Sequence, residues 1–189
     1  MEKENKTKVS GFKYWLNFGW EILKTVIISL VIIIPIRYFL IQPFFVQGAS
    51  MEPNFLDGDY LIIDEITYRF DGPERGDVVV FRYPLDTSQF FIKRVIGLPG
   101  ETIKIEDGRI FIYEKDSQTP IILSEVEYLR DGYTAGNMEV VLKDNEYFVL
   151  GDNRGSSSDS RKWGAVPEND IVGRVWVRAW PFNRLEIIK

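Results

Sequence analysis

The chain has 189 residues, of which 45% are hydrophobic, and this is enough for one folded domain with an appendage but not for a large second domain. It carries a formal net charge of −5 and contains neither histidine nor cysteine. A Ser-His-Asp triad, a Cys-His protease site, a disulfide framework, and zinc, haem or iron-sulfur sites built on thiolates or imidazoles are therefore excluded. Covalent catalysis would have to use Ser, Thr, Lys, Tyr or a carboxylate.

Charge is distributed unevenly along the chain. Residues 1–49 hold six Lys or Arg residues against three Glu residues, a balance of +3, which leaves −8 for residues 50–189. An acidic bulk argues against a nucleic-acid-binding surface, so we expect no nucleic-acid partner.

An apolar segment near the N-terminus is long enough to cross a membrane. Residues 25–36 read TVIISLVIIIPI, without a charge, and the apolar character extends over residues 22–41. At about 1.5 Å per residue, a segment of this length spans the roughly 30 Å of bilayer hydrocarbon. A cleaved secretory signal and a buried helix of a soluble protein are the alternatives. The bulky Phe44 and Phe45 close before Ala49 disfavour a signal cleavage site there.

Flanking charges predict the orientation of this anchor. Several lysines precede it, and Arg37 is the only cation close behind it. By the positive-inside rule, the N-terminus lies in the cytoplasm and the acidic domain lies outside. We therefore predict a cytoplasmic tail and interfacial segment at 1–21, a transmembrane helix at 22–41 and an extracytoplasmic domain at 42–189. The preceding lysines are Lys3, Lys6, Lys8, Lys13 and Lys24.

Beyond residue 49 the pattern is that of β-strands. Apolar residues alternate with polar ones or form short runs between Gly, Pro, Asp and Asn, which is typical of antiparallel sheets. The clearest hairpin is TIKIEDGRIFIY, in which Asp107-Gly108 suits a type I′ turn. Residues 113–142 have weak periodicity, and we expect a surface excursion there. The other strands are predicted at 60–63, 78–83, 90–96, 147–150 and 171–180.

The predicted fold class is mostly β: an antiparallel, barrel-like sheet domain tethered by one N-terminal transmembrane helix. Four residues near the C-terminus have two open interpretations, because they either rest in the lipid headgroup region or fill the β core. They are Trp176, Trp180, Pro181 and Phe182.

Ser50 is the first candidate nucleophile. It stands just after the apolar segment, in GASMEPNFLDGDY, where the small residues before it leave the hydroxyl accessible. A serine beside Gly and Ala is also common in ordinary turns. Its hydroxyl becomes a good nucleophile only when a base removes the proton, and without histidine that base must be Lys, Asp, Glu or Tyr.

Lys93 is the best-placed base. In FFIKRVIG, strand alternation puts Lys93 on one face with Phe91 and Val95, while Arg94 takes the opposite face. Apolar surroundings disfavour the ammonium form, and a pKa lowered from about 10.4 to about 8 corresponds to roughly 3 kcal/mol. Arg94 cannot serve, because guanidinium groups stay protonated in proteins. The alternative is an edge-strand lysine that snorkels to solvent and deters aggregation.

A hydroxyl-rich loop, GDNRGSSSDSRKWG at 151–164, is the third candidate segment. Its opposite charges stand close together, so Asp159 and Arg161 can pair and shape the loop. A serine hydroxyl of the loop can then be aimed at the lysine amine. A solvated loop without any such role has the same composition.

Together these segments resemble type I signal peptidases, the membrane-bound Ser/Lys endopeptidases of bacteria. The resemblance covers essentially the whole chain, because an apolar tether is followed, in the family's order, by GASMEPNFLDGDY, RGDVVVFRYP, FIKRVIGLPGE and GDNRGSSSDSRKWGAVP. The chain lacks the extra β domain of the larger members and is similar to the compact Gram-positive form.

The resemblance implies that Ser50 is the nucleophile and Lys93 the general base that deprotonates it, with an acyl-enzyme as the intermediate. Ser157 matches the position whose hydroxyl supports the lysine. Asp159 and Arg161 match the pair that holds the site together.

Of two further residues beside the nucleophile, Met51 matches the family and Gly48 departs from the pattern of some members. Met51 lies in the turn around Ser50. Gly48 stands where some members have a hydroxyl residue that helps to bind the oxyanion. The oxyanion hole would therefore use backbone N–H groups, chiefly that of Ser50.

Substrate binding is expected along strand edges. The cleavage region of a signal peptide is extended and can pair with an exposed edge at residues 43–47 and 90–92. Apolar side chains would wall shallow pockets that admit only small residues, which selects an Ala-x-Ala pattern by exclusion. The substrate-binding candidates are Phe44, Val46, Gln47, Phe55, Val80, Phe90, Phe91 and Ile92.

The expected function is cleavage of signal peptides from exported preproteins at the bacterial plasma membrane, beside the Sec or Tat export machinery, without a metal or cofactor. One rival is a LexA-like Ser/Lys self-cleaving protein, which would need a DNA-binding module where residues 1–49 have an apolar span. The other is a non-catalytic, membrane-anchored β domain that binds exported chains.

Overall fold

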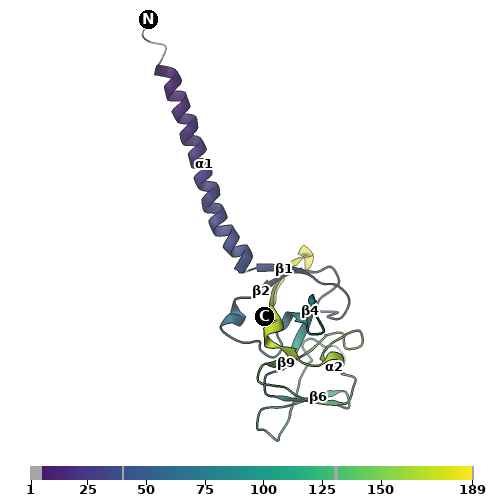
Figure 1. Ribbon diagram of the computed structural model, residues 1–189. Coiled ribbons are helices and arrows are strands. Elements are labelled where there is room, and N and C mark those ends of the chain that lie inside the picture. The colour runs from purple at the N-terminus through teal and green to yellow at the C-terminus, as the bar shows by residue number, and fades with distance from the viewer. Residues whose placement is uncertain (1–5, 40, 130–131, 189) are drawn as a thin grey trace. The chain divides into compact units, whose positions relative to one another are not determined.

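The computed structural model describes residues 6–39, 41–129 and 132–188. The chain divides into two compact units, Met1–Leu40 and Ile41–Lys189. The described part of the first unit is the helix α1 (Lys6–Phe39), drawn in purple in Figure 1. The second unit holds all of the described strands.

Helix α1 contains one stretch, Lys13–Ile34, that is long and apolar enough to cross a membrane by its length and composition. This stretch has 22 residues and a mean hydropathy of 1.8, and its side chains are exposed. The predicted span at 22–41 differs from it at both ends. The apolar surface begins earlier because aromatic and apolar residues also precede Glu21, and Ile41 pairs with Asp64 as the first residue of a strand.

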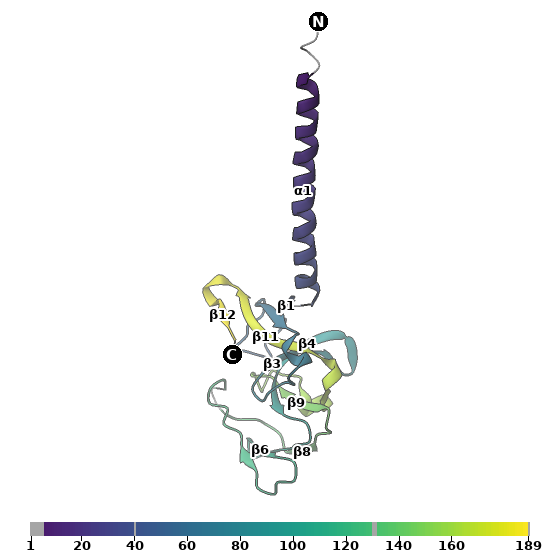
Figure 2. The same ribbon diagram turned by 90° about the vertical axis from the view of Figure 1, so that its left-hand side faces the viewer.

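The second unit consists of antiparallel strands in two sheets (Figure 2). The larger sheet has the order β1-β2-β11-β3-β4-β9-β10, with β12 paired to β11, and the smaller sheet has the order β7-β6-β5-β8. The predicted mostly β, antiparallel class is confirmed. The strands of the larger sheet are β1 (Ile41–Phe45), β2 (Tyr60–Asp64), β3 (Val78–Tyr83), β4 (Asp86–Gly97), β9 (Glu146–Leu150), β10 (Val166–Pro167), β11 (Ile171–Trp180) and β12 (Glu186–Ile187). The strands of the smaller sheet are β5 (Thr102–Glu106), β6 (Arg109–Tyr113), β7 (Ile121–Ile122) and β8 (Met138–Val141).

Four short helical turns connect these strands. They are η1 (Thr67–Arg69), α2 (Ser160–Trp163), η2 (Glu168–Asp170) and η3 (Phe182–Arg184). Helix α2 begins where the side chain of Asp159 accepts a hydrogen bond from the backbone N–H of Arg161. This cap satisfies a backbone donor that the first turn of a helix otherwise leaves free.

The predicted hairpin at 102–113 is the β5–β6 pair. Asp107 and Gly108 have φ angles of 49° and 76°, which are the positive values that both central residues of a type I′ turn require. The predicted turn is therefore confirmed.

Residues 113–142, predicted as a surface excursion, contain two short strands, and most of the described residues of the segment are exposed or half-buried. Strand β7 pairs with β6 and β8 pairs with β5, so the segment supplies both edges of the smaller sheet. Glu125, Leu129 and Thr134 are buried as well. Strands of two and four residues are too short for the period-two pattern to be recognised against the surrounding charges.

Three apolar clusters form the core. One lies beneath the loop that joins β1 to β2 and includes Met51 and Phe55. A second packs the isoleucines of β5 and β6 against Phe148 and Leu150 of β9, and a third lies between β3, β4 and β9. The core therefore supports the 46–59 loop from below and joins the two sheets.

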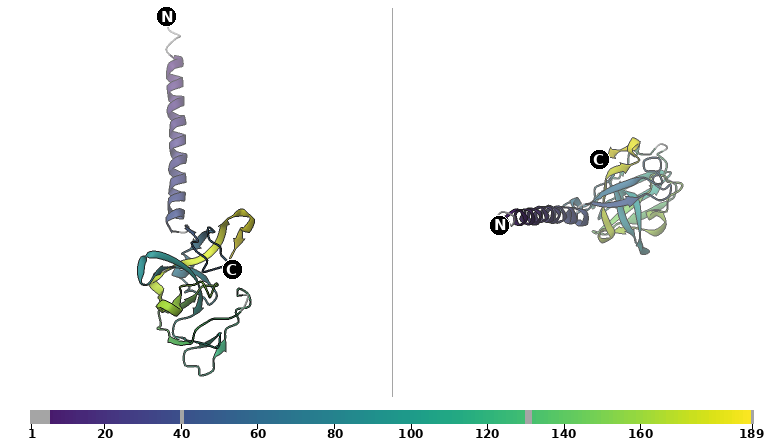
Figure 3. Two further views of the ribbon diagram at one scale, coloured as in Figure 1. Left: turned by 90° about the vertical axis from the view of Figure 1, so that its right-hand side faces the viewer. Right: turned by 90° about the horizontal axis from the view of Figure 1, so that it is seen from above.

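The C-terminal aromatic residues do not fill this core. Trp176, Trp180 and Phe182 are 44%, 51% and 73% exposed, on or just after β11, in the hairpin that Figure 3 shows in yellow. The core-filling interpretation is wrong for these three side chains. Contact with lipid headgroups stays a prediction.

Candidate active site

Ser50 lies in a tightly held turn between β1 and β2. The side chain of the next residue, Met51, is fully buried in the core, and the Met51 carbonyl accepts a hydrogen bond from the Phe55 N–H at 2.9 Å. The N–H of Gly48 donates to Asp57 Oδ1 at 2.7 Å. Gly48 has a φ of +84°, which glycine adopts without strain. These contacts fix the backbone around Ser50, while its side chain stays half-buried.

Lys93 reaches Ser50 from the middle of β4. Its Nζ lies 2.7 Å from Ser50 Oγ and 2.8 Å from the Ile92 carbonyl oxygen. The residue is 4% exposed, so the interpretation as a snorkelling edge lysine is wrong. Burial lowers the pKa of Lys93 to about 8, although the charges of Asp159 and Asp152 act in the opposite direction. A neutral amine at this distance can accept the hydroxyl proton.

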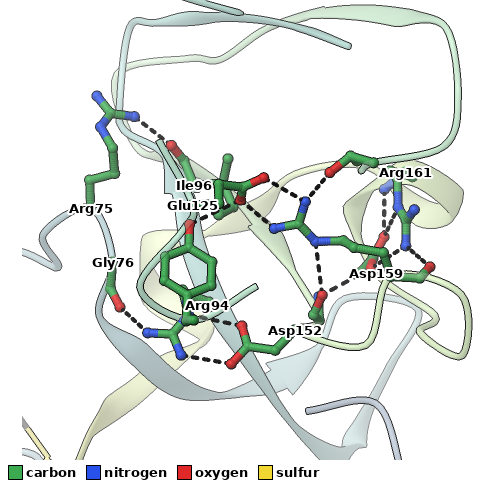
Figure 4. Close-up of polar contacts among 12 residues, drawn as sticks. Arg75, Gly76, Arg94, Ile96, Glu125, Asp152, Asp159 and Arg161 are labelled. Carbon is green, nitrogen blue, oxygen red and sulfur yellow. Dashed lines mark hydrogen bonds and ion pairs between the residues drawn. The ribbon is translucent and has the colours of Figure 1, made fainter. Parts of the chain in front are cut away.

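Asp159 and Arg161 form the predicted pair. Arg161 Nε donates to Asp159 Oδ1 at 2.8 Å and Nη2 donates to Oδ2 at 2.9 Å, which is a two-point contact (Figure 4). Asp159 is fully buried and also accepts from the N–H of Gly151 at 3.2 Å. Burial alone would raise the pKa of Asp159, but the hydrogen bonds and charge of Arg161 hold it below its ordinary value.

Ser157 is buried next to the turn that carries Ser50. The hydrogen bonds of Lys93 Nζ go to Ser50 and Ile92 and not to Ser157, whose hydroxyl instead helps to hold the pKa of Asp159 low. A Cβ added at Gly151 would lie 2.3 Å from Ser157 Oγ and 2.5 Å from the Ser50 carbonyl oxygen. The loop therefore packs tightly against the nucleophile turn, and the support of Lys93 by the Ser157 hydroxyl stays a prediction.

Arg94 and Asp152 form a second pair that the sequence did not reveal. Arg94 Nε and Nη2 donate to Asp152 at 2.8 and 2.7 Å, and Nη1 donates to the Gly76 carbonyl at 2.8 Å (Figure 4). The guanidinium also lies 4.1 Å from the centre of the Tyr128 ring. The pair ties the far face of β4 to the loop that carries Asp159. The sequence held one signal for this pair. Strand alternation puts Arg94 on the face opposite Lys93, and a guanidinium there needs an acidic partner.

A groove of about 590 Å³ opens onto Ser50 and Lys93. All of the predicted substrate-binding residues except Phe55 line it: Phe44, Val46, Gln47, Val80, Phe90, Phe91 and Ile92. Phe55 is 2% exposed and packs in the core beneath the loop. The turn that its N–H closes onto the Met51 carbonyl directs the ring inward. Phe45, within the predicted edge at 43–47, also lines the groove, and the sequence missed further lining residues, which are Ala49, Leu61, Gln89, Ser156 and Ser158.

Two strand edges border this groove. Strand β1 is the first strand in the sheet order, and β9 pairs with β4 only from Arg94 onward in the described part of the chain. The rings of Phe44 on β1 and Phe90 on β4 lie 5.4 Å apart. Residues 89–92 therefore face β1 with backbone groups that an extended chain can pair with.

The described residues, 6–39, 41–129 and 132–188, contain no group of three or more acidic side chains placed to hold a metal ion. The polar side chains that line the groove are serine hydroxyls, glutamine amides and the Lys93 amine.

Comparison with known proteins assigns the family. The family described as signal peptidase, peptidase S26, matches residues 19–180. A probable signal peptidase I-2 from Synechocystis sp. is 37% identical over 180 residues, which cover 92% of this chain and 77% of that protein. Signal peptidase IB from Staphylococcus aureus is 30% identical over 177 residues, which cover 88% of this chain and 92% of that protein.

Among solved structures, a crystal structure of a signal peptidase I from Enterococcus faecalis V583 is 30% identical and covers 56% of this chain and 97% of that chain, with a TM-score of 0.47. The family match extends over most of the chain, and the two relatives match over nearly its whole length. This chain therefore belongs to the signal peptidase family, peptidase S26.

Proposed function

We propose that this chain is a membrane-anchored serine endopeptidase that removes signal peptides from exported preproteins, with Ser50 as nucleophile and Lys93 as general base. The observation that carries the proposal is the contact of 2.7 Å between Lys93 Nζ and Ser50 Oγ, made by an amine that is almost completely buried. Membership of the signal peptidase family supports the substrate class.

Acylation begins with the neutral amine of Lys93, which takes the proton of Ser50 as Oγ attacks the carbonyl carbon of the scissile peptide bond. The developing oxyanion meets backbone N–H groups at the nucleophile turn, chiefly that of Ser50, because Gly48 has no side chain to contribute. The Lys93 ammonium then gives its proton to the departing amine. The mature protein leaves with its new N-terminus, and the signal peptide stays as an ester on Ser50.

Deacylation reverses the roles. With the amine neutral again, Lys93 takes a proton from a water molecule that attacks the ester carbonyl, and it returns that proton to Ser50 Oγ as the ester bond breaks. Lys93 thus carries a single proton in each half of the reaction. Asp159 and Arg161 act as positioning residues, because they shape the loop against Ser50 without touching the reacting atoms.

The groove accounts for small residues at the cleavage site. A signal peptide in extended form would lie between β1 and residues 89–92 of β4 and hydrogen-bond to their free backbone groups. The side chains of Phe44, Val80 and Ile92 occupy the space into which its alternate side chains point. Pockets that are already filled admit alanine and exclude larger residues, so selection occurs by exclusion.

Helix α1 supplies the anchor in this proposal. The Lys13–Ile34 stretch spans the bilayer with its N-terminal, lysine-rich end in the cytoplasm, which puts the catalytic unit outside the plasma membrane. There it would meet preproteins as the Sec or Tat export machinery delivers them. Reaction of external and internal single-cysteine variants with a membrane-impermeant thiol reagent tests the orientation.

Cleavage by the full-length protein in detergent tests the proposal. Wild-type protein is incubated with a preprotein, and the new N-terminus is sequenced. Ser50→Ala and Lys93→Met should each lower the rate by roughly 10⁴-fold or more, because nucleophile and base act as a unit. Lys104→Met is the matched control, since Lys104 lies on the smaller sheet in a partly exposed pair with Glu106. Normal cleavage by either dyad variant would refute the mechanism.

A further inference from the structure

A buried ion pair connects the 151–160 loop to the segment that the sequence described as a surface excursion. The side chains of Arg154 and Glu125 are 6% and 5% exposed. Both terminal nitrogens of Arg154 bind the Glu125 carboxylate, with Nη1 to Oε2 at 2.9 Å, and Nη1 also donates to the Thr134 hydroxyl. Neither residue lines the groove at Ser50 and Lys93. The proposed mechanism assigns no role to the Arg154–Glu125 pair.

Arg154 also binds the backbone of its own loop. Its Nε donates to the Gly151 carbonyl at 3.0 Å, and its carbonyl accepts from Arg161 Nη2 at 2.7 Å. The planar guanidinium can make the Gly151 and Glu125 contacts together only in one orientation, because its donors form a rigid fork. Glu125 therefore sets the direction in which Arg154 holds the Gly151 carbonyl.

Gly151 is in turn the point at which the loop meets the nucleophile. A Cβ there would overlap Ser157 Oγ and the Ser50 carbonyl, so the backbone of Gly151 already packs against both. Two residues on, the N–H of Asn153 donates to the Ser50 carbonyl at 3.0 Å. A shift of the Gly151–Asn153 backbone would be passed directly to Ser50.

Stability alone does not explain this pair. Burying two charges costs desolvation that their attraction often only balances, and apolar replacements of similar size are commonly as stable or more so. The particular property of the Arg154–Glu125 pair is its fixed geometry relative to a backbone carbonyl next to the site.

We propose that Glu125 is a positioning residue for the reaction at Ser50, and that it acts through Arg154 on the Gly151 carbonyl. This inference rests on the proposed function, because it assigns Glu125 to the same site. It gives the segment between β6 and β8 a part in catalysis although none of its residues contacts the groove.

Four variants of the full-length protein in detergent test the inference. Glu125→Gln keeps the shape of the side chain and removes the charge, and it should lower kcat about tenfold while KM changes by less than about twofold. Glu127→Gln is the matched control, because Glu127 is exposed two residues away, and it should leave both constants unchanged. Arg154→Met should resemble Glu125→Gln in kcat.

The double variant Glu125→Leu/Arg154→Met separates positioning from stability. Removing both buried charges should return Tm to near the wild-type value, whereas kcat should stay reduced because the hydrogen bond to the Gly151 carbonyl is gone. Recovery of kcat together with Tm in this double variant would overturn the inference, and so would a wild-type kcat in Glu125→Gln.

A readout that does not need cleavage separates this inference from the proposed function. The pKa of Lys93 can be followed by NMR of protein labelled with ¹³C at lysine Cε. Loosening the loop should hydrate the amine and raise its pKa from about 8 in Glu125→Gln but not in Glu127→Gln. If wild-type protein fails to cleave a preprotein, the proposed function fails whether or not the Lys93 pKa responds to Glu125→Gln. An unchanged Lys93 pKa in Glu125→Gln contradicts the positioning role by itself.

Discussion

The two sheets of the second unit differ in what they bury besides apolar side chains. The smaller sheet is filled with isoleucines, Ile103, Ile105, Ile110 and Ile112, each at most 1% exposed. The larger sheet buries an amine, Lys93, beside the carboxylates of Asp152 and Asp159. Apolar burial stabilises the fold, whereas burial of an amine that must be able to lose its proton destabilises it. The comparison teaches that the larger sheet combines its apolar clusters with a buried amine, whereas the smaller sheet contributes apolar burial alone.

The cost of the buried amine depends on pH. The pKa of Lys93 is lowered from 10.5 to about 8, which corresponds to roughly 3 kcal/mol. Between about pH 8 and pH 10.5 the unfolded chain binds more protons than the folded one, so the free energy of unfolding rises with pH in this window. Below about pH 8 the full cost is present.

Lys93→Met gives the largest contrast between activity and stability. Cleavage should fall by roughly 10⁴-fold or more, because no other group at Ser50 can take the proton. The free energy of unfolding at pH 7 should not fall and should rise by up to roughly 3 kcal/mol, because the desolvated ammonium is gone. Denaturant unfolding of wild type and variant at pH 7 and pH 10 measures this.

The control for that experiment is the pH dependence of the difference in stability between wild type and Lys93→Met. Wild-type protein should gain stability from pH 8 to pH 10 relative to Lys93→Met, and the difference should disappear at pH 10.5 and above. A variant that is less stable than wild type at pH 7 would mean that the amine is not desolvated.

Ile103→Ala should produce the opposite result in the smaller sheet. Ile103 is fully buried between the two sheets, and its truncation should lower the free energy of unfolding by about 2–5 kcal/mol. The kcat of the folded fraction should stay within about twofold, because no residue of this cluster lines the groove. Chemical denaturation and cleavage at 25 °C measure the two effects. A large loss of kcat without loss of stability would show that the smaller sheet affects the reaction directly.

The sequence predicted the larger sheet better than the smaller one for a physical reason. Long strands such as β3 and β11 have enough residues for alternation and apolar runs to be recognised, and their predicted bounds match the structure. The Asp107-Gly108 turn is local and carries its own signal. Strands β7 and β8 are two and four residues long and exist because longer neighbours pair with them.

The site shows the same distinction. Ser50 and Lys93 were recognised from local segments, because their neighbours and the resemblance to a family point to them. The contact between Glu125 and Arg154 joins residues 29 positions apart, and neither has a local pattern that reveals its burial. Phe55 was misplaced because an apolar residue near a nucleophile has the same sequence signal whether it lines a groove or packs beneath it.

Gly151→Ala tests how closely the loop of the larger sheet must approach the nucleophile. The added Cβ would lie 2.3 Å from Ser157 Oγ and 2.5 Å from the Ser50 carbonyl oxygen. A displacement of Ser50 by about 1 Å lowers kcat roughly 100-fold. Adding Ser157→Ala removes the overlap with Oγ but keeps those with Ser157 Cβ at 2.6 Å and with the Ser50 carbonyl oxygen, so it should not restore activity. Restoration would show that only the overlap with the Ser157 hydroxyl matters.

The change of the cleavage rate with pH is the smallest expected effect, and it depends on Lys93 in the larger sheet. With the pKa of Lys93 at about 8, roughly one amine in eleven is neutral at pH 7 and most are neutral at pH 9, so kcat/KM should rise about tenfold over this range. The profile should reach a plateau above pH 9, because no further proton has to leave the free enzyme. Ile103→Ala should keep the midpoint near pH 8 although it is less stable, since its side chain lies in a cluster that does not line the groove. A flat profile would exclude Lys93 as the base, and a midpoint that moves in Ile103→Ala would show that packing of the smaller sheet controls the hydration of the amine.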